Sequence, residues 1–574
     1  MKIFKLHSVL LLCAILCNHA NSQSNQFAWV KQFGDVGSDA GNCILVDASG
    51  DLLTCGFFRG KVDFDPNEDQ NFLTSSGSED IYLSRLNTDG KLLWAKRMGG
   101  KEADRGNQLT TDQMGNIYLT GNFKDMAEFE SGVPNSKLTS TGFGDAFVAK
   151  LNRDGQLIWV KQIGGNLDDI GKSISIDQSG NILISGHFQG TADFDPGANV
   201  FPLSSVGSYD VFILKLDADG NFIWAKKIGG KLDDQCAAIT TDSKNDVIVT
   251  GNYKDTVDFN PGSDIYNLKD SGAGNAFALK LNAEGEFIWA KSTVGQNIVF
   301  SIGMAIDQTG NIFTTGFFRS EADFDPGPDI LKLTAPGIGG DVFISKLDSD
   351  GNLVWVKQFS GPAHDVGLGI CLDQQGNVYT TGCYQELVDF DPGQQVFNLY
   401  SSNQNNNDIF ITKLNPEGNF LWARGMNGPA SDIGFSIAVD APYNVYTTGV
   451  FGSTLNVNPG PDSLLITSKG SEDIFLNKIS QTSVNAIDHS DISPLIIFPN
   501  PAHNFVKMEW ISQTESAAQF HIMDLNGTEL YHKQLNIKSG KNELSLGPLT
   551  LIPGWYFVIL RFSNKTIQQK ILIH

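Results

Sequence analysis

Short apolar and alternating runs, separated by turns rich in aspartate and glycine, recur along most of the chain. One unit has such runs at 108–111, 117–123, 145–151 and 157–163. Turns at 112–115 and 154–155 separate the first two and the last two runs. Runs of this length between turn residues are typical of antiparallel hairpins, and no helical period accompanies them. The pattern predicts four antiparallel strands per unit.

The unit recurs seven times with a strict period. Tryptophan recurs in steps of 65, 65, 65, 65, 66 and 67 residues, at Trp29, Trp94, Trp159, Trp224, Trp289, Trp355 and Trp422. An Asp-Phe-Asp motif and its weaker copies follow the same steps, centred on Phe64, Phe129, Phe194, Phe259, Phe324, Phe390 and Val457. Regular repetition of a four-stranded antiparallel unit is typical of a β-propeller, with one unit per blade.

The two ends of the repeat region are complementary. The chain enters at 27–33, which matches a fourth strand, and the last repeat ends at 473–479, a third strand. We therefore expect the N-terminal strand to complete the last blade, since closure removes the exposed edges. An open solenoid is the alternative and would need caps. The sequence thus predicts an all-β, seven-bladed propeller over residues 23–479.

The segments outside the repeats have other patterns. Residues 1–22 place two lysines before an apolar run at 9–16 and end in small residues, which is typical of a signal peptide. That apolar run is too short to span a membrane. Residues 480–494 break the pattern and are predicted to be a linker. Residues 495–574 contain six strand candidates with glycine turns, which predicts a small β-sandwich.

The C-terminal segment resembles the type A sorting domain of type IX secretion cargo. The resemblance rests on residues 498–502, 524–527 and 554–556 and on Lys570 ahead of 571–573. The repeats resemble bacterial secreted β-propeller repeat proteins, in which Asp-Phe-Asp-Pro-Gly blocks alternate with strands such as 376–382. The resemblance implies export, delivery by residues 495–574 through the outer-membrane secretion machinery, and a secreted or outer-surface location. It implies no biochemical activity.

The charge of the chain excludes one class of partner, and the cysteine positions limit the possible disulfides. The formal net charge is −23, and both end segments are slightly basic, so residues 23–494 carry −27. Such an acidic surface repels phosphate backbones and argues against a nucleic-acid partner.

Five cysteines follow the predicted signal peptide, at Cys43, Cys55, Cys236, Cys371 and Cys383. Cys43 and Cys55 face each other across the predicted hairpin, whereas Cys371 and Cys383 do not, so we expect at most one cross-strand disulfide.

Residues that recur once per blade are first interpreted as structural. The tryptophans are expected to pack between blades. Glycine in each second strand (such as Gly121) indicates a close approach of backbones. The turn aspartates (such as Asp112) are expected to accept hydrogen bonds from their own turns.

The Asp-Phe-Asp motif is the repeated feature with candidate chemistry. Alternate carboxylates beside turn carbonyls suit Ca²⁺. The candidate calcium ligands are Asp63, Asp65, Asp193, Asp195, Asp323, Asp325, Asp389 and Asp391. The full calcium loop with a later glutamate is absent, and the favoured alternative is that phenylalanine packs between blades while the aspartates cap turns. A second aspartate stands ten residues after each tryptophan except at Val299, so we expect the motif carboxylates and this second set to form an acidic rim on the face with long connections.

The sequence identifies no catalytic residues. The propeller has two histidines, His187 and His364, and neither stands with a nucleophile motif. The clearest departure from the repeat is 293–301, so any single asymmetric site is expected near blades five and six. The favoured function is an exported binding or adhesion scaffold without catalysis. A polysaccharide-active hydrolase or lyase and a purely structural surface component are the alternatives.

Overall fold

The structure, a computed structural model, describes two parts of the chain. In the repeat region it describes residues 24–65, 67, 70–270, 273–337, 339–403, 405–459 and 463–482. In the C-terminal region it describes residues 496–498, 506–512, 516–523, 529–547, 551, 554–562 and 566–573. The predicted signal peptide and most of the predicted linker lie outside these residues. Asn25–Gln481 form one compact unit. Within the described ranges the regular structure is all β-strand, and no helix there is long and apolar enough to cross a membrane.

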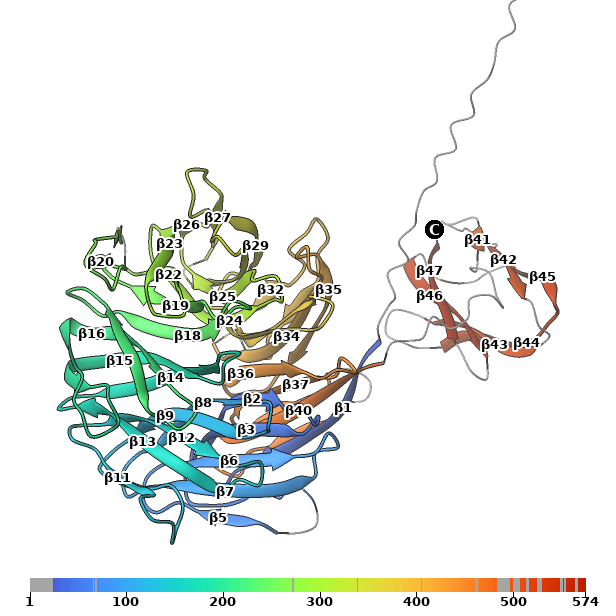
Figure 1. Cartoon of the computed structure of the whole chain (residues 1–574). Helices are drawn as coiled ribbons and strands as arrows, with labels where there is room; N and C mark the ends of the chain where they lie inside the picture. The colour runs from blue at the N-terminus through green and yellow to red at the C-terminus, as the bar shows by residue number, and fades with distance from the viewer. Residues whose placement is uncertain are drawn as a thin grey trace, which may run out of the picture. The chain divides into compact units, whose positions relative to one another are not determined.

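Each blade is an antiparallel sheet of four strands, and the first strands lie innermost. They are β2 (Ala40–Val46), β8 (Arg105–Thr111), β14 (Asp169–Ile176), β18 (Gln235–Thr241), β24 (Val299–Ile306), β30 (Val366–Leu372) and β36 (Asp432–Val439). Around them run the second strands: β3 (Leu52–Phe58), β9 (Ile117–Phe123), β15 (Ile182–Asp193), β19 (Val247–Tyr253), β25 (Ile312–Phe318), β31 (Val378–Tyr384) and β37 (Val445–Phe451). In Figure 1 the colours pass from blade to blade around the ring in chain order.

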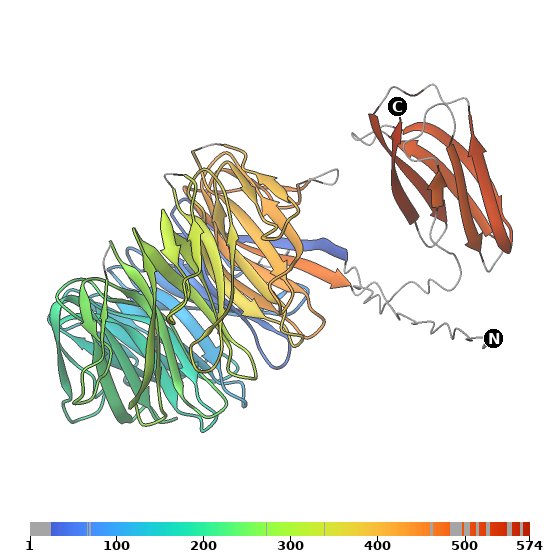
Figure 2. The ribbon, with the colours of Figure 1, turned by 90° about the horizontal axis from the view of Figure 1, so that it is seen from above.

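The third and fourth strands form the outer half of each blade. The third strands are β6 (Asp80–Leu86), β12 (Asp145–Leu151), β16 (Pro202–Leu216), β22 (Asn275–Leu281), β28 (Asp341–Leu347), β34 (Asp408–Leu414) and β40 (Asp473–Thr482). The fourth strands are β7 (Leu92–Gly100), β13 (Leu157–Gly165), β17 (Phe222–Ile228), β23 (Phe287–Gly295), β29 (Leu353–Phe359), β35 (Phe420–Met426) and β1 (Ser24–Phe33). The sheet order β1-β40-β37-β36 places the N-terminal strand in the seventh blade, beside β40 (Figure 2). The predicted seven blades and their closure are confirmed.

Short hairpins interrupt the connections between second and third strands. They are β4 (Lys61–Asp63) with β5 (Phe72–Thr74), β10 (Met126–Glu128) with β11 (Lys137–Thr139), β20 (Thr256–Asp258) with β21 (Asn267–Lys269), β26 (Glu321–Asp323) with β27 (Lys332–Thr334), β32 (Leu387–Asp389) with β33 (Asn398–Tyr400), and β38 (Thr454–Asn456) with β39 (Leu465–Thr467). In blade three, β15 and β16 extend to form the hairpin themselves. Each hairpin carries an Asp-Phe-Asp motif or its weaker copy, and β10 and β26 also pair with the fourth strand of the preceding blade.

The repeated aromatic residues hold neighbouring blades together. Phe64 is fully buried, with ring centroids 5.7 Å from Phe33 and 4.9 Å from Tyr82. Trp29 of the closing strand donates its indole N–H to the carbonyl of Thr88 in the next blade at 3.3 Å. Gly90 in the same turn has φ +75°, and a Cβ there would lie 3.3 Å from the Trp29 ring, so glycine is required twice over. The predicted packing of tryptophan between blades is confirmed.

The C-terminal region forms two sheets around a core of its own. Its strands are β41 (Ile496–Phe498), β42 (Val506–Ser512), β43 (Ser516–Met523), β44 (Glu529–Ile537), β45 (Gly540–Leu546), β46 (Gly554–Phe562) and β47 (Thr566–Ile573). One sheet has the order β41-β42-β45 and the other β44-β43-β46-β47. Met508, Phe520 and Val558 are buried between them. The predicted sandwich is confirmed, while the motif residues 499–502 and 524–527 lie outside the described residues.

The cysteines are free thiols, and their register matches the prediction. Cys43 pairs across the hairpin with Cys55. Cys371 stands opposite Tyr379, and Cys383 stands opposite Val366, so these two cysteines do not face each other.

Candidate functional site

A β-bulge in every first strand turns one side chain toward the propeller axis. In blade two the register shifts between Gly106 and Gln108, which leaves Asn107 without a partner on β9. A bulge commonly re-aims a side chain in this way. The distortion brings the carbonyl of Arg105 over Gly121, where an added Cβ would lie 1.9 Å from that oxygen. The predicted close approach at the second-strand glycines is therefore confirmed, and its cause is the bulge.

The seven bulged residues line one channel along the axis, with a volume of about 590 Å³. They are Asn42, Asn107, Lys172, Ala237, Ile302, Leu368 and Phe435. Blades one to three contribute the polar side chains, and blades four to seven contribute the apolar ones. The channel wall therefore has a polar side and an apolar side.

The two asparagines of the polar side are already engaged. The Nδ2 of Asn42 donates to the carbonyl of Gly106 at 2.9 Å, and the Nδ2 of Asn107 donates to the carbonyl of Gly171 at 2.8 Å. Each amide thus satisfies a backbone acceptor of the next blade. These side chains add polarity to the wall, but their donors stabilise the junctions between blades.

Lys172 is the charged residue of the polar side. Its side chain is open to the channel, yet the surrounding wall desolvates the ammonium and lowers its pKa. It makes no ion pair or hydrogen bond with the described residues. An ammonium in a confined site without a partner is unfavourable, so it favours either loss of its proton or the arrival of an anion.

The titratable groups near Lys172 are poorly suited to catalysis. Burial lowers the pKa of His187 to about 4, and the nearby charge of Lys172 adds to this effect. Burial raises the pKa of Cys236 to about 12, and its sulfur lies 2.8 Å from the Ser185 hydroxyl. At neutral pH the thiol keeps its proton, so the thiolate needed for nucleophilic attack is not formed.

The other histidine, His364, lies away from this channel wall. Its ring is 5.1 Å from Phe317 in an edge-on contact, and burial lowers its pKa. The neighbouring Asp365 is buried and is hydrogen-bonded to the backbone N–H of Gln385 at 2.9 Å. The two side chains therefore serve separate packing environments.

The candidate calcium ligands cap the turns of their hairpins. In the hairpin of blade one, Asp63 accepts hydrogen bonds from the N–H groups of Asp65 and Asn71, at 3.1 and 2.8 Å. Equivalent bonds recur at Asp193, Asp323 and Asp389, and Asp195, Asp325 and Asp391 each accept one from a glycine N–H. The described residues contain no group of three or more His, Cys, Asp or Glu side chains placed to hold a metal. Calcium at this motif stays a prediction.

The second set of aspartates does not form the expected acidic rim. Asp39, Asp104, Asp169, Asp234, Asp365 and Asp432 are all buried, with at most 1% of each residue exposed. Asp104 shows the reason: its carboxylate accepts from the N–H of Gly100 at 2.6 Å and from that of Lys124 at 3.0 Å. The second set therefore does not contribute to the expected rim, because these carboxylates turn inward to cap backbone groups. The motif carboxylates, such as Asp63 and Asp65, are partly exposed, so the part of the rim assigned to them is not contradicted.

Each of these aspartates faces another buried carboxylate from the preceding blade. A Cβ added to Gly99 would lie 2.8 Å from Oδ2 of Asp104 and 2.9 Å from Cγ of Asp80, so the two groups converge there. Burial, with the neighbouring carboxylate, raises the pKa of Asp104 to about 7. The Oδ1 of Asp80 is buried without a described hydrogen-bond partner. Burial together with the facing carboxylate therefore favours the protonated form of a carboxylate in this pair near neutral pH.

One junction lacks this pair. Between blades four and five the corresponding residues are Asn275 and Val299, both fully buried. The side-chain oxygen of Asn275 accepts from the N–H of Gly295 at 3.0 Å. This is the departure at 293–301 that the sequence analysis associated with an asymmetric site. The structure shows that an uncharged pair takes the place of two carboxylates there.

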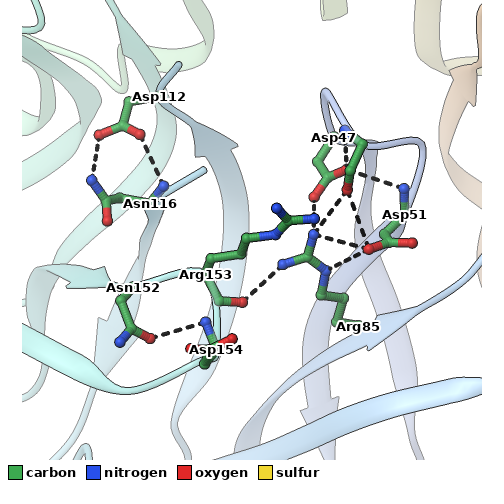
Figure 3. Close-up of polar contacts among 9 residues, drawn as sticks. Asp47, Asp51, Arg85, Asp112, Asn116, Asn152, Arg153 and Asp154 are labelled. Carbon is green, nitrogen blue, oxygen red and sulfur yellow. Dashed lines mark hydrogen bonds and ion pairs between the residues drawn. The ribbon is translucent and has the colours of Figure 1, made fainter. Parts of the chain in front are cut away.

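The opposite ends of the blades bury cations instead. Arg85 pairs with Asp47 and Asp51 of its own blade and donates to the carbonyl of Arg153 in the next blade at 2.8 Å (Figure 3). Lys215 and Lys280 occupy the same position and pair with Asp177 and Asp242, at 3.0 and 2.8 Å.

In three other blades the cation lies over a tyrosine whose hydroxyl binds the turn aspartate, and Lys413 also comes within 3.7 Å of Asp373. The equivalent lysines Lys150, Lys413 and Lys478 lie over the rings of Tyr118, Tyr379 and Tyr446. The hydroxyls of these tyrosines donate to the turn aspartates Asp112, Asp373 and Asp440. The turn aspartates also accept from their own turns, such as the N–H of Asn116 to Asp112 at 2.9 Å, as predicted.

The sequence patterns did not reveal the bulged residues, or the buried cation that recurs in the third strands at Arg85 and its lysine equivalents. Both positions are detectable from spacing. The bulged residue always stands three positions after the second-set aspartate (or Val299), which itself follows each tryptophan by ten residues. The cation recurs with nearly the same period as tryptophan. The first position was overlooked because its residue type changes in most blades, and the second because a lysine in a β-strand usually faces solvent.

Two family models match parts of the chain. Residues 496–574 match the secretion system C-terminal sorting domain. Residues 158–187, which span a fourth strand and the following two strands, match the β-propeller repeat.

Two known proteins match larger parts of the chain at low sequence identity. An uncharacterized WD repeat-containing protein of Acanthamoeba polyphaga mimivirus is 24% identical over 70% of this chain. The regulatory protein FlaEY of Caulobacter vibrioides is 22% identical over 41% of it. The chain spans 34% of the first protein and 24% of the second. A puromycin hydrolase mutant complexed with PGG is a structural neighbour at 11% identity and TM-score 0.32, covering 75% of this chain and 59% of its own. That score is too low to support any conclusion.

Proposed function

We propose that this chain, a secreted or outer-surface β-propeller repeat protein with a C-terminal type IX sorting domain, is a non-catalytic binding protein whose ligand enters the central channel. The observation that carries the proposal is the chemical difference among the seven bulged residues. They change from asparagine and lysine to alanine, isoleucine, leucine and phenylalanine around one ring.

The contrast with the other repeated positions supports this proposal. Tryptophan, the second-strand glycine and the turn aspartate are the same in all seven blades, because each makes a repeated structural contact. Tryptophan contacts the next blade, glycine the bulged first strand of its own blade, and aspartate its own turn. The bulged position faces open space, so packing does not require a particular residue there. A ligand site needs unlike groups around one point, and the axis is where this repeat supplies them.

The chemistry around the channel supports binding more than turnover. The protonated thiol of Cys236 and the neutral His187 supply neither a strong nucleophile nor a proton donor at neutral pH. The buried carboxylate pairs are occupied in joining blades. A binding role uses the same wall without requiring any activated group.

A ligand screen with a blocked channel tests the proposal. The full chain is screened against glycans, peptides and small organic molecules, beside the variant Ala237→Trp, whose indole would project into the channel and obstruct it. The control is Ile223→Ser, which changes an exposed residue of β17. We expect the ligands found for the native chain to be lost with Ala237→Trp and kept with Ile223→Ser.

Two results would contradict the proposal. Ligand binding that survives in Ala237→Trp, with the variant folded by circular dichroism, would place the site outside the channel. Chemical conversion of a bound glycan would contradict the non-catalytic role and favour the hydrolase or lyase alternative.

Delivery to the surface is tested separately from binding. We expect a chain lacking 495–574 to accumulate in the periplasm, because the sorting domain that directs it outward is removed. Cell fractionation with a surface protease measures this. Unchanged surface display would contradict the sorting role of this segment.

A further inference from the structure

Lys172 differs from the buried cations at the short-turn ends of the blades, because its side chain is open to the channel. Arg85, Lys215 and Lys280 each lie within about hydrogen-bond distance of a carboxylate, and Lys413 lies 3.7 Å from Asp373. Lys172 has no such partner among the described residues, although the channel wall desolvates it. Lys150 and Lys478 also lack a carboxylate at ion-pair distance, but each donates to a backbone carbonyl of the next blade and lies over a tyrosine ring. Lys172 has neither kind of partner among the described residues, so its ammonium is available on the axis.

The remaining charged residues of the channel do not neutralise Lys172. Arg105 donates to Glu79 at 2.7 Å and lies over the ring of Phe57. Glu472 accepts from the hydroxyl of Ser38 at 2.7 Å. Arg105 is therefore neutralised by its own partner, whereas Glu472 keeps its negative charge beside a neutral hydroxyl. Among the described residues neither of them forms an ion pair or hydrogen bond with Lys172.

The opposite side of the wall is a continuous apolar surface. Ile302, Leu368 and Phe435 come from three consecutive blades, and Met304 and Ile370 line the same channel. The volume of about 590 Å³ lies within the range of about 300–1,000 Å³ typical of small-molecule sites. A molecule that fills this space can contact both sides at once.

We propose that the channel binds a small organic carboxylate, whose carboxylate pairs with the ammonium of Lys172 and whose hydrocarbon part packs against Ile302, Leu368 and Phe435. This inference rests on the proposed function, since it names the ligand class of the same channel. The pairing would restore the protonated form of Lys172 by supplying the missing negative charge.

The wall favours a singly charged group over phosphate. One ammonium balances one negative charge, and the amide donors of Asn42 and Asn107 are occupied by backbone carbonyls. A phosphate dianion would bring a second negative charge that the described wall does not balance, because the Arg105 guanidinium is already paired with Glu79. An uncharged hydrocarbon would contact only the apolar side and would leave Lys172 unpaired.

Calorimetry on the full chain tests this ligand class with four probes. Octanoate supplies both features, octanol lacks the charge, acetate lacks the hydrocarbon, and inorganic phosphate represents the doubly charged group. The variants are Lys172→Met, which keeps the length of the side chain, and Lys172→Arg, which keeps the charge. At pH 7 we expect octanoate to bind the native chain most tightly, and Lys172→Met to weaken it about tenfold or more. Lys172→Arg should retain most of the affinity, and octanol should not distinguish the variants.

A chemical measurement on the native chain avoids dependence on any variant. Reductive methylation of Lys172 is followed by mass spectrometry in the presence of each probe. Octanoate should slow methylation at Lys172 and leave the exposed Lys332 unaffected, whereas octanol should slow neither.

The outcomes separate this inference from the proposed function. If octanoate does not bind, or binds Lys172→Met as tightly, the carboxylate assignment is overturned. The proposed function still stands in that case if the ligands found in the screen bind the native chain and are lost with Ala237→Trp. If phosphate binds better than octanoate, the site recognises an anion and not an amphipathic carboxylate, and the inference fails.

Discussion

The two ends of each blade bury opposite charges and compensate them differently. At the short-turn end, Arg85 and its lysine equivalents meet carboxylates or tyrosine rings. At the long-connection end, pairs such as Asp80 and Asp104 bring two carboxylates together, and burial raises their pKa values. Asp80 also pairs with the partly exposed Arg97 at 3.2 Å, yet burial still raises its pKa to about 6. The comparison teaches that the buried cations meet a carboxylate or an aromatic ring, whereas burial shifts the paired carboxylates toward their protonated form. The stability of the folded chain should therefore respond to mutation at the cation end and to pH at the carboxylate end.

The largest effect is expected from removing a buried cation. Arg85→Met leaves Asp47 and Asp51 beside each other without their counter-ion, and breaking such a pair costs about 3–5 kcal/mol. Urea unfolding at pH 7 measures the loss. Lys332→Met is the matched control, because Lys332 pairs with Glu321 at the surface and should contribute less than about 1 kcal/mol. Similar losses in both variants would show that burial does not distinguish the two pairs.

The next effect is a fall in stability as pH rises. Burial raises the pKa of Asp39 and Asp234 to about 7, and that of Asp169, Asp365 and Asp432 to about 8, from 3.8. Between pH 4 and pH 8 the folded state therefore holds more protons than the unfolded chain, so stability decreases with rising pH. We expect the melting temperature at pH 8 to be lower than at pH 5 by about 5 °C or more.

Other groups act in the opposite direction and limit this effect. The pKa of His187 is lowered to about 4, so its contribution to stability is lost as pH falls from 6.5. Asp177 and Asp307 have lowered pKa values, and their contributions are lost at more acidic pH. A melting temperature that rises steadily from pH 5 to pH 8 would contradict protonation at the carboxylate pairs.

A smaller effect is expected when one carboxylate is made neutral. Asp432→Asn keeps an oxygen that can accept from the N–H of Gly452, and it resembles the junction at Asn275. It should change stability by less than about 0.5 kcal/mol at pH 5 and raise it by about 1 kcal/mol at pH 8, since the ionisation is removed. The measurement is the pH slope of the urea midpoint, with Asp219→Asn at an exposed turn as control. An unchanged slope would mean that the Asp408–Asp432 pair does not titrate in this range.

The smallest effect is expected from a chelator. The aspartates of the Asp-Phe-Asp hairpins already accept backbone hydrogen bonds, so EDTA should leave the melting temperature unchanged. Added Ca²⁺ should be equally without effect. A melting temperature that EDTA lowers and Ca²⁺ restores would support the calcium prediction and would place bound Ca²⁺ at the long-connection end.

The spacing of repeated residues predicted the ring of blades, because units of equal length and pattern fold into equal structures. Tryptophans 65 residues apart must occupy equivalent positions if each unit folds alike, and Trp29 and Trp94 do. The orphan strand at 27–33 predicted the closure with β40 for the same reason. Residue type predicted less about the channel. Lys172 and Phe435 share no chemistry, and only the bulge shows that they occupy one position.

The sequence by itself determined the number of blades, their strand order, the closure and the separate C-terminal sandwich, because repetition and turn residues act locally. The tertiary structure alone decided which charges are buried and what they meet. Asp104 has an ordinary loop sequence around it, yet it becomes a buried proton-binding group because Asp80 of the preceding blade faces it. Lys172 remains the available cation because the turn aspartates that pair with Lys215 and Lys280 lie at the other end of the strands. Such pairings depend on how neighbouring blades meet, which no local pattern specifies.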